Sequence, residues 1–220
     1  MRAAAALVLL LVPAAGLAQT PRVVLTGSLA AAEHRVEDRG VGGGVEISDG
    51  TLFGSGVRVS VGSRGTIAVS GRTGVLHPQR GATLPRDVAE LGLDGTLMLH
   101  PWFDVIAGVR VRSYTTMLAR QRWTMPYLGA AARVPFAVQG LRGLLDITVH
   151  PFAGVSGLTR PEVAISTGAG VAYARGRLDV QLGYAFERYD FARGTVAERF
   201  EQLSVLTLQV QVRALERPVP

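Results

Sequence analysis

The stretch that decides the fold is Leu206-Thr207-Leu208-Gln209-Val210-Gln211-Val212-Arg213, close to the end of the chain. Its apolar side chains fall on every second residue, and polar side chains occupy the positions between them. Successive side chains of a β-strand point to opposite faces, so the pattern predicts a strand with one apolar and one polar face. Because a slip of one residue would reverse both faces, the same pattern also fixes the register of pairing.

The alternation recurs along the chain in segments of roughly ten residues, each followed by a cluster of Gly, Pro, Ser, Arg or Asp. Tight turns are predicted near Ser63, Pro101 and Arg175 and over residues 134–142, and longer loops over residues 35–51, 78–87, 116–121, 157–161 and 192–198. The predicted strands are residues 23–34, 52–62, 66–77, 88–99, 102–115, 122–134, 143–156, 162–174, 177–190 and 199–213.

These segments predict an all-β fold, a closed antiparallel transmembrane β-barrel of about ten strands in up-and-down order. An even number of strands places both termini at the end with the short turns. Pro126 and Pro151 fall inside predicted strands, where proline cannot donate to the ladder, so we expect a bulge, a kink or a shorter strand there. A barrel of eight strands is the alternative if segments fail.

A soluble β-sandwich also alternates, because one face of each strand packs inward. Its polar face would meet bulk water and carry many charges. In this chain the polar face is rich in Gly, Ala, Ser and Thr with single charges between them, which favours a narrow, closed lumen.

The N-terminus has the pattern of an export signal. Arg2 precedes an apolar run from Ala3 to Val12, Pro13 follows, and Gly16 and Ala18 are small enough for signal peptidase. We expect residues 1–18 to be a cleaved signal peptide and residues 19–220 to form a single barrel domain. The apolar run is about half of the roughly 20 residues that a spanning helix needs.

Composition narrows the chemistry. The chain has no cysteine and, read from end to end, no lysine, so thiol nucleophiles, zinc-thiolate sites, a P-loop lysine and a Schiff-base lysine are excluded. The formal net charge is +6, but the arginines are scattered, so we expect no nucleic-acid partner. The pairs His77-Pro78, His100-Pro101 and His150-Pro151 fit no metal-ligand spacing and favour turns. No cofactor and no metal site is predicted.

The most suggestive group is a set of charges on the predicted inner face. Both signs are present, and unpaired charges in a narrow lumen are costly. They predict either an ion-pair network that braces the wall and plugs the bore, or a small pore whose arginines prefer anions. The members are Arg58, Arg72, Glu90, Asp94, Arg110, Arg112, Asp146, Asp179 and Glu187.

With this signal, alternation and turn chemistry, the chain resembles the small outer-membrane β-barrel proteins of Gram-negative-type bacteria, of the porin-like or opacity type. The resemblance is architectural and carries no family motif. It implies location in the bacterial outer membrane, contact with outer-membrane lipid, and the barrel-assembly machinery as a partner during biogenesis, with small solutes or anions as possible ligands. Two aromatic girdles are expected, one from Trp102, Phe103 and Phe136, and an outer one from Tyr114, Trp123, Tyr127, Tyr184, Phe186, Tyr189, Phe191 and Phe200.

The function predicted is a structural, narrow-channel or surface-binding role, with no catalytic residue assigned. An outer-membrane hydrolase with a rim active site, a surface adhesin and a secreted β-sandwich binding protein are the alternatives. The rim candidates for a hydrolase are His34, His77, Asp87 and Asp190, and none has a partner nearby in the sequence.

Overall fold

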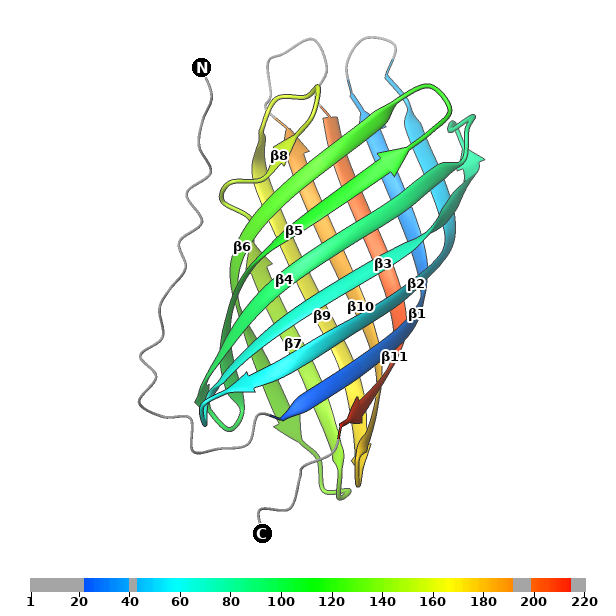
Figure 1. The fold of residues 1–220 in the computed structure, drawn as a ribbon. Coiled ribbons are helices and arrows are strands. Elements are labelled where there is room, and N and C mark those ends of the chain that lie inside the picture. Colours follow the sequence, from blue (N-terminus) through cyan, green and yellow to red (C-terminus); the bar gives the residue numbers. More distant parts are fainter. Residues whose placement is uncertain (1–21, 40–42, 192–198, 215–220) are drawn as a thin grey trace.

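Ten long strands and one short strand form a single closed sheet in the computed structural model, which describes residues 22–39, 43–191 and 199–214 (Figure 1). Every pairing is antiparallel. The strands are β1 (Val23–Asp38), β2 (Val45–Val61), β3 (Gly65–Arg80), β4 (Arg86–His100), β5 (Phe103–Thr115), β6 (Arg120–Pro135), β7 (Leu141–Val149), β8 (Gly154–Val155), β9 (Pro161–Arg175), β10 (Leu178–Phe191) and β11 (Arg199–Arg213).

The ten long strands follow one another around the wall in chain order, and the ring closes where β1 pairs with β11. The prediction of a closed meander of ten strands is therefore confirmed, and the eight-stranded and sandwich alternatives are wrong. Closure leaves no sheet edge in need of protection. No helix in the described part of the chain is long and apolar enough to cross a bilayer.

The two ends of the barrel differ. At one end, which we call the turn end, short connections join β2 to β3, β4 to β5, β6 to β7 and β9 to β10. Gly176 has a φ of 59° in the turn between β9 and β10, a conformation that glycine adopts without strain. The first and last described strands also meet there, since the Ala214 amide donates to the Val23 carbonyl. The opposite end is the loop end.

Several strands are longer than predicted at the loop end. Residues 35–51 were expected to form a loop, but β1 continues to Asp38 and β2 begins at Val45. Likewise β3 continues to Arg80 and β4 begins at Arg86. Polar and charged residues replace aliphatic ones in these extensions, which hides the alternation, yet the ladder hydrogen bonds continue regardless of the side chains. These strands are therefore longer than the 9 to 11 residues that a strand needs to cross a bilayer.

The two prolines have different consequences. β7 ends at Val149, immediately before His150-Pro151, so the shorter strand predicted from Pro151 is present. β6 is uninterrupted at Pro126, so the expected defect is absent there. The reason is local: β6 pairs with β7 from Leu128 onward and with β8 at Trp123 and Thr124, and Pro126 lies in the gap between these pairings, where no amide donor is needed.

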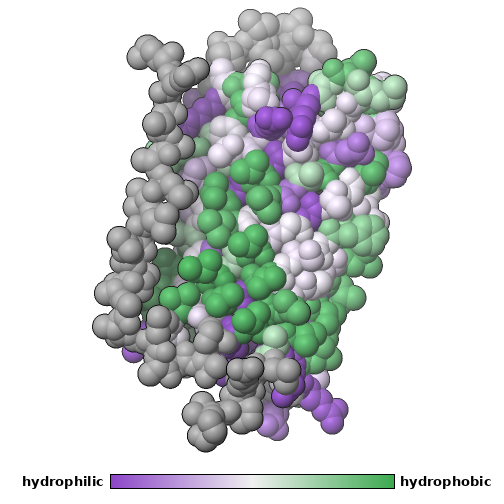
Figure 2. All heavy atoms as spheres, in the orientation of Figure 1, coloured by the Kyte–Doolittle hydropathy of each residue, from purple (hydrophilic) through white to green (hydrophobic). Residues whose placement is uncertain are grey.

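The outer surface is apolar around its middle. The residues that alternate in the sequence point outward, and Leu208 on β11 is 47% exposed. Figure 2 shows apolar side chains gathered over the middle and lower part of one face, with hydrophilic side chains toward both ends. An apolar band between polar ends is the surface that a bilayer requires of a barrel.

Candidate functional site: a plugged lumen

Five charged side chains meet in the middle of the lumen. We call them the ion cluster: Arg72 on β3, Glu90 on β4, Arg110 and Arg112 on β5, and Glu187 on β10. Arg72 Nη2 donates to Glu90 over 3.0 Å, and Arg112 Nε donates to the same carboxylate over 2.5 Å. The sequence alternation places all five side chains on the inner face, because each lies an even number of residues from inward neighbours on its strand.

Glu187 joins the two sides of the barrel. In the ring of ten strands, β10 lies halfway round from β4, so a side chain from β10 reaches the cluster only across the bore. Arg112 forms a bidentate ion pair with Glu187, in which each terminal nitrogen lies 2.8 Å from a carboxylate oxygen. Arg110 Nη1 also donates to Glu187 over 3.1 Å. The Tyr189 hydroxyl donates to it over 2.8 Å. The Arg112 and Glu187 side chains are only 2% and 3% exposed, so the pair blocks the bore.

The geometry satisfies most of the hydrogen-bonding capacity of the two carboxylates. Three guanidinium groups surround two carboxylates, and bidentate arginine pairing of this kind is the strongest form of charge-assisted hydrogen bond. One positive charge is in excess. A cluster that is paired in this way compensates for the desolvation of its members, whereas the loss of one member leaves a buried charge uncompensated.

An apolar core surrounds and overlies the ion cluster on the side of the loop end. Its largest member, Trp123 on β6, is 1% exposed and lies 4.7 Å from the Tyr189 ring, centroid to centroid. The other members are Ala30, Ala32, Leu52, Leu76, Val88, Tyr114, Met125, Ala153, Tyr189, Phe191, Leu203 and Val205. The lumen is therefore closed twice, by charge pairing and by close packing.

Five of the eight aromatic residues predicted for the outer girdle lie inside the barrel instead. Tyr114, Trp123, Tyr127, Tyr189 and Phe191 are buried inside the barrel rather than placed at a lipid boundary. Their position near strand ends suggested a girdle, but the alternation of their strands turns them inward. The three aromatic residues predicted for the girdle at the turn end, Trp102, Phe103 and Phe136, are all exposed, as a position on the outer surface requires.

A second buried pair, which sequence reasoning missed, lies nearer the loop end. His34 Nε2 on β1 is 3.2 Å from Glu201 on the neighbouring β11, and the His34 ring stacks on Tyr114 at 4.5 Å. Arg86 contacts the other ring nitrogen of His34 at 3.2 Å and also pairs with Glu46. The partners are 167 residues apart in the sequence, so no local signal could have joined them.

Of the other hydrolase candidates, His77 and Asp87 face away from the lumen and are exposed, and Asp190 pairs with Arg188 on its own strand. The four rim candidates therefore do not assemble into one site. His34 has an acidic partner, but both side chains are almost fully buried. Within the described ranges, no cluster of three or more His, Cys, Asp or Glu side chains could hold a metal ion.

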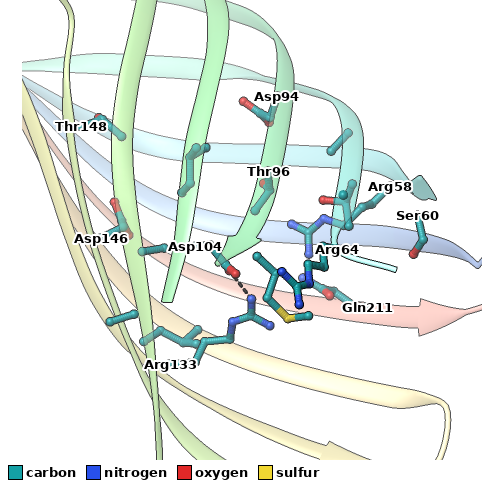
Figure 3. A pocket seen from close by; sticks show the side chains of 18 of the residues that line it. Arg58, Ser60, Arg64, Asp94, Thr96, Asp104, Arg133, Asp146, Thr148 and Gln211 are labelled. Atoms are coloured by element: carbon teal, nitrogen blue, oxygen red, sulfur yellow. Dashed lines mark hydrogen bonds and ion pairs between the residues drawn. The ribbon is translucent and has the colours of Figure 1, made fainter. Parts of the chain in front are cut away.

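The half of the lumen toward the turn end is hollow. A cavity of about 600 Å³, which we call the vestibule, opens there and is lined by side chains from most strands of the barrel. Figure 3 shows Arg58, Arg64, Asp94, Thr96, Asp146 and Gln211 around it, with Arg133 paired to Asp104. The lining also includes Gln181 and Gln209, which face each other on β10 and β11.

The structure divides the nine predicted inward charges into two groups. Arg72, Glu90, Arg110, Arg112 and Glu187 meet in the ion cluster. Arg58, Asp94 and Asp146 line the vestibule, which Arg110 also borders, and Asp179 lies beside it, paired with Arg142. The sequence could not have shown this division, because it depends on the height of each residue along the barrel.

Charge is distributed unequally between the two ends. In the four turns, within four residues of them, or at the start of β1 and the end of β11, the described residues include eight arginines and only two carboxylates, Asp104 and Asp179. We call these arginines the collar: Arg22, Arg58, Arg64, Arg133, Arg142, Arg175, Arg177 and Arg213. The mouth of the vestibule is therefore strongly positive.

Comparison with known proteins gives a fold and no closer relationship. No model of a known protein family matches the chain, and no curated protein matches it by sequence. Among solved structures, the outer membrane protease OmpT from Escherichia coli matches with a TM-score of 0.65 at 11% identity, over 88% of this chain and 97% of that chain. The β domain of the Bordetella autotransporter BrkA matches less well, with a TM-score of 0.47 at 15% identity, over 89% of this chain and all of that chain.

At such identities the likeness concerns the fold alone, and it agrees with the strand order, the closed ladder and the apolar band described above. The chain has the fold of the bacterial outer-membrane β-barrel proteins, with ten antiparallel strands around a lumen that is filled toward the loop end and hollow toward the turn end.

Proposed function

We propose that this protein is a plugged outer-membrane barrel with a structural or surface-binding role, and that it does not act as an open pore. The observation that carries the proposal is the bidentate Arg112–Glu187 pair, which spans the bore in a buried layer. A solute entering from the vestibule would have to separate this pair and then displace the apolar core.

The apolar core makes opening by a simple rearrangement of charges unfavourable. Trp123, Leu52, Leu76 and Met125 are among the largest fully buried side chains of the protein, and they come from different parts of the wall. Closely packed interiors resist gradual deformation, so a path for ions requires that several of these side chains move together. A rigid plug also stabilises the barrel, which fits a structural role.

The role of a rim hydrolase receives less support. Its chemistry needs a base or a nucleophile that a substrate can reach, whereas the His34–Glu201 pair is enclosed by Tyr114, Arg86 and the neighbouring wall. The likeness to a protease does not change this, since it extends to the fold alone.

Conductance in planar lipid bilayers tests the proposal. The wild-type barrel is expected to insert without a steady ion current. Arg112→Ala combined with Trp123→Ala removes the two largest fully buried side chains of the plug and is expected to give measurable current. Trp102→Ala, on an exposed tryptophan at the turn end, is the control and should stay closed. A steady current through the wild-type barrel would overturn the proposal.

A further inference from the structure

We propose that the vestibule binds a phosphorylated polyol, with the phosphate held at the mouth by Arg58 and Arg64 and the hydroxyl groups directed inward toward Asp94 and Asp146. The ligand class is defined by its chemistry, which a free sugar phosphate and the glycerol phosphate headgroup of phosphatidylglycerol share. The proposal goes beyond a plugged barrel, because a cavity can bind a ligand without conducting it.

The first step of the argument is the state of the two arginines. Arg58 and Arg64 are exposed to the cavity that they line, and in the described part of the chain neither has a carboxylate within ion-pair distance. Arg133 and Arg142, close by at the same end, are instead engaged by Asp104 and Asp179. Two guanidinium groups therefore remain available to a ligand, and arginine is well suited to phosphate because its planar donors match the oxygen geometry.

The second step is the gradient of charge along the vestibule. By strand register, Arg58 lies three residues from the turn end of β2, and Arg64 lies in the turn that follows it. Asp94 and Asp146 lie further inside, six residues from the end of β4 and five from the start of β7. An anion is therefore favoured at the mouth and disfavoured beside the carboxylates of Asp94 and Asp146, deeper in the cavity. An occupant with one charged and one neutral polar end fits this gradient.

The third step is the character of the inner wall. Carboxylates accept hydrogen bonds from hydroxyl groups, and Asp94 and Asp146 face the cavity from different strands. Gln181, Gln209 and Thr96 add groups that both donate and accept. Hydroxyl groups can meet both needs, and a volume of about 600 Å³ lies within the range of small-molecule sites.

Isothermal titration calorimetry of the folded barrel in a non-ionic detergent tests the proposal, with glucose 6-phosphate as the probe. We expect saturable binding of one molecule per barrel, and binding at least about tenfold weaker for glucose and for inorganic phosphate, since each carries only half of the recognised groups. The double variant Arg58→Gln and Arg64→Gln should bind glucose 6-phosphate at least about tenfold more weakly than the wild type.

Arg80→Gln is the matched control, because Arg80 is an exposed arginine at the loop end of β3. Its affinity should equal that of the wild type. All variants are first checked for the change in gel mobility on heating that a folded barrel gives. A double variant that folds and binds as tightly as the wild type would refute the proposal, as would the absence of heat with the wild type in both this titration and the lipid measurement below.

A second measurement separates the two sources of the ligand. The barrel is placed in lipid nanodiscs of phosphatidylcholine alone or with added phosphatidylglycerol, and the titration is repeated. If the headgroup is the natural occupant, phosphatidylglycerol weakens the apparent affinity for glucose 6-phosphate, and the double variant removes this competition. If a free solute is the occupant, the affinity is the same in both discs. Either result supports the shared chemistry.

Discussion

Substituting Glu187 tests whether the ion cluster stabilises the barrel. Glu187→Gln keeps the shape of the side chain but leaves three arginines of the lumen with one carboxylate, Glu90. It removes both 2.8 Å contacts to Arg112 as charge pairs and the 3.1 Å contact to Arg110. Removing one partner of a buried pair destabilises a protein by about 3–5 kcal/mol, and the surplus of positive charge places this change toward the upper end.

A double-mutant cycle isolates the interaction. Arg112→Met alone leaves two arginines and two glutamates, so we expect a loss at the lower end of the range, about 3 kcal/mol. The double variant restores the wild-type excess of one positive charge. Its loss should be smaller than the sum of the single losses by about 2–3 kcal/mol, which is the coupling expected between residues in direct contact.

Urea unfolding of the barrel in lipid vesicles provides the assay. Tryptophan fluorescence follows the transition, because Trp123 is buried in the plug and becomes exposed on unfolding. Asp190→Asn, in an exposed pair with Arg188, is the control and should unfold with the wild type. The reasoning fails if Glu187→Gln is as stable as the wild type, or if the losses of the two single variants are simply additive.

Two further predictions concern the wall and the lumen. Leu208→Arg, on the lipid-facing side of β11, should reduce the free energy of unfolding in lipid vesicles by about 2–4 kcal/mol. Gln209→Arg, at the next residue and facing the lumen, should reduce this free energy clearly less, and equal reductions would contradict the assignment of faces. Gly129→Ala should destabilise the barrel by about 1–3 kcal/mol in the same assay, because an added Cβ would meet backbone and side-chain atoms of β7 within 3 Å. Gly27→Ala is the control and should be tolerated, since its Cβ would meet nothing within 4 Å.

Much of the fold could be predicted from the sequence because alternation is a local property. Leu206 to Arg213 forms a strand in which each apolar residue faces outward, and the turn at Arg175-Gly176 joins β9 to β10. The prediction failed where local composition changes but pairing does not. Residues 35–38 and 45–51 contain Gly, Asp, Glu and Arg and read as a loop, yet they continue the ladders of β1 and β2.

The candidate site was predictable only in part. The inward direction of Arg112 and Glu187 follows from the alternation within each strand. Their contact does not, because 75 residues separate them and β10 faces β5 only once the sheet has closed into a ring. The same reason explains why the His34–Glu201 pair was missed. Tyr114 and Trp123 were placed in a girdle for another reason, namely that their positions near strand ends were used as the guide. Distance from a strand end gives no information about which side of the wall a ring occupies.

By itself, the sequence determined the antiparallel barrel and which side chains face the lipid and which the lumen, because the two faces of a strand are set by the period of the chain. Only the tertiary structure decided which inward side chains meet. That depends on closure of the ring and on the tilt of its strands, which set the height of each residue along the bore. Glu187 consequently closes the lumen with Arg112, while Arg58 and Asp94, equally polar and equally inward, are left around an open cavity.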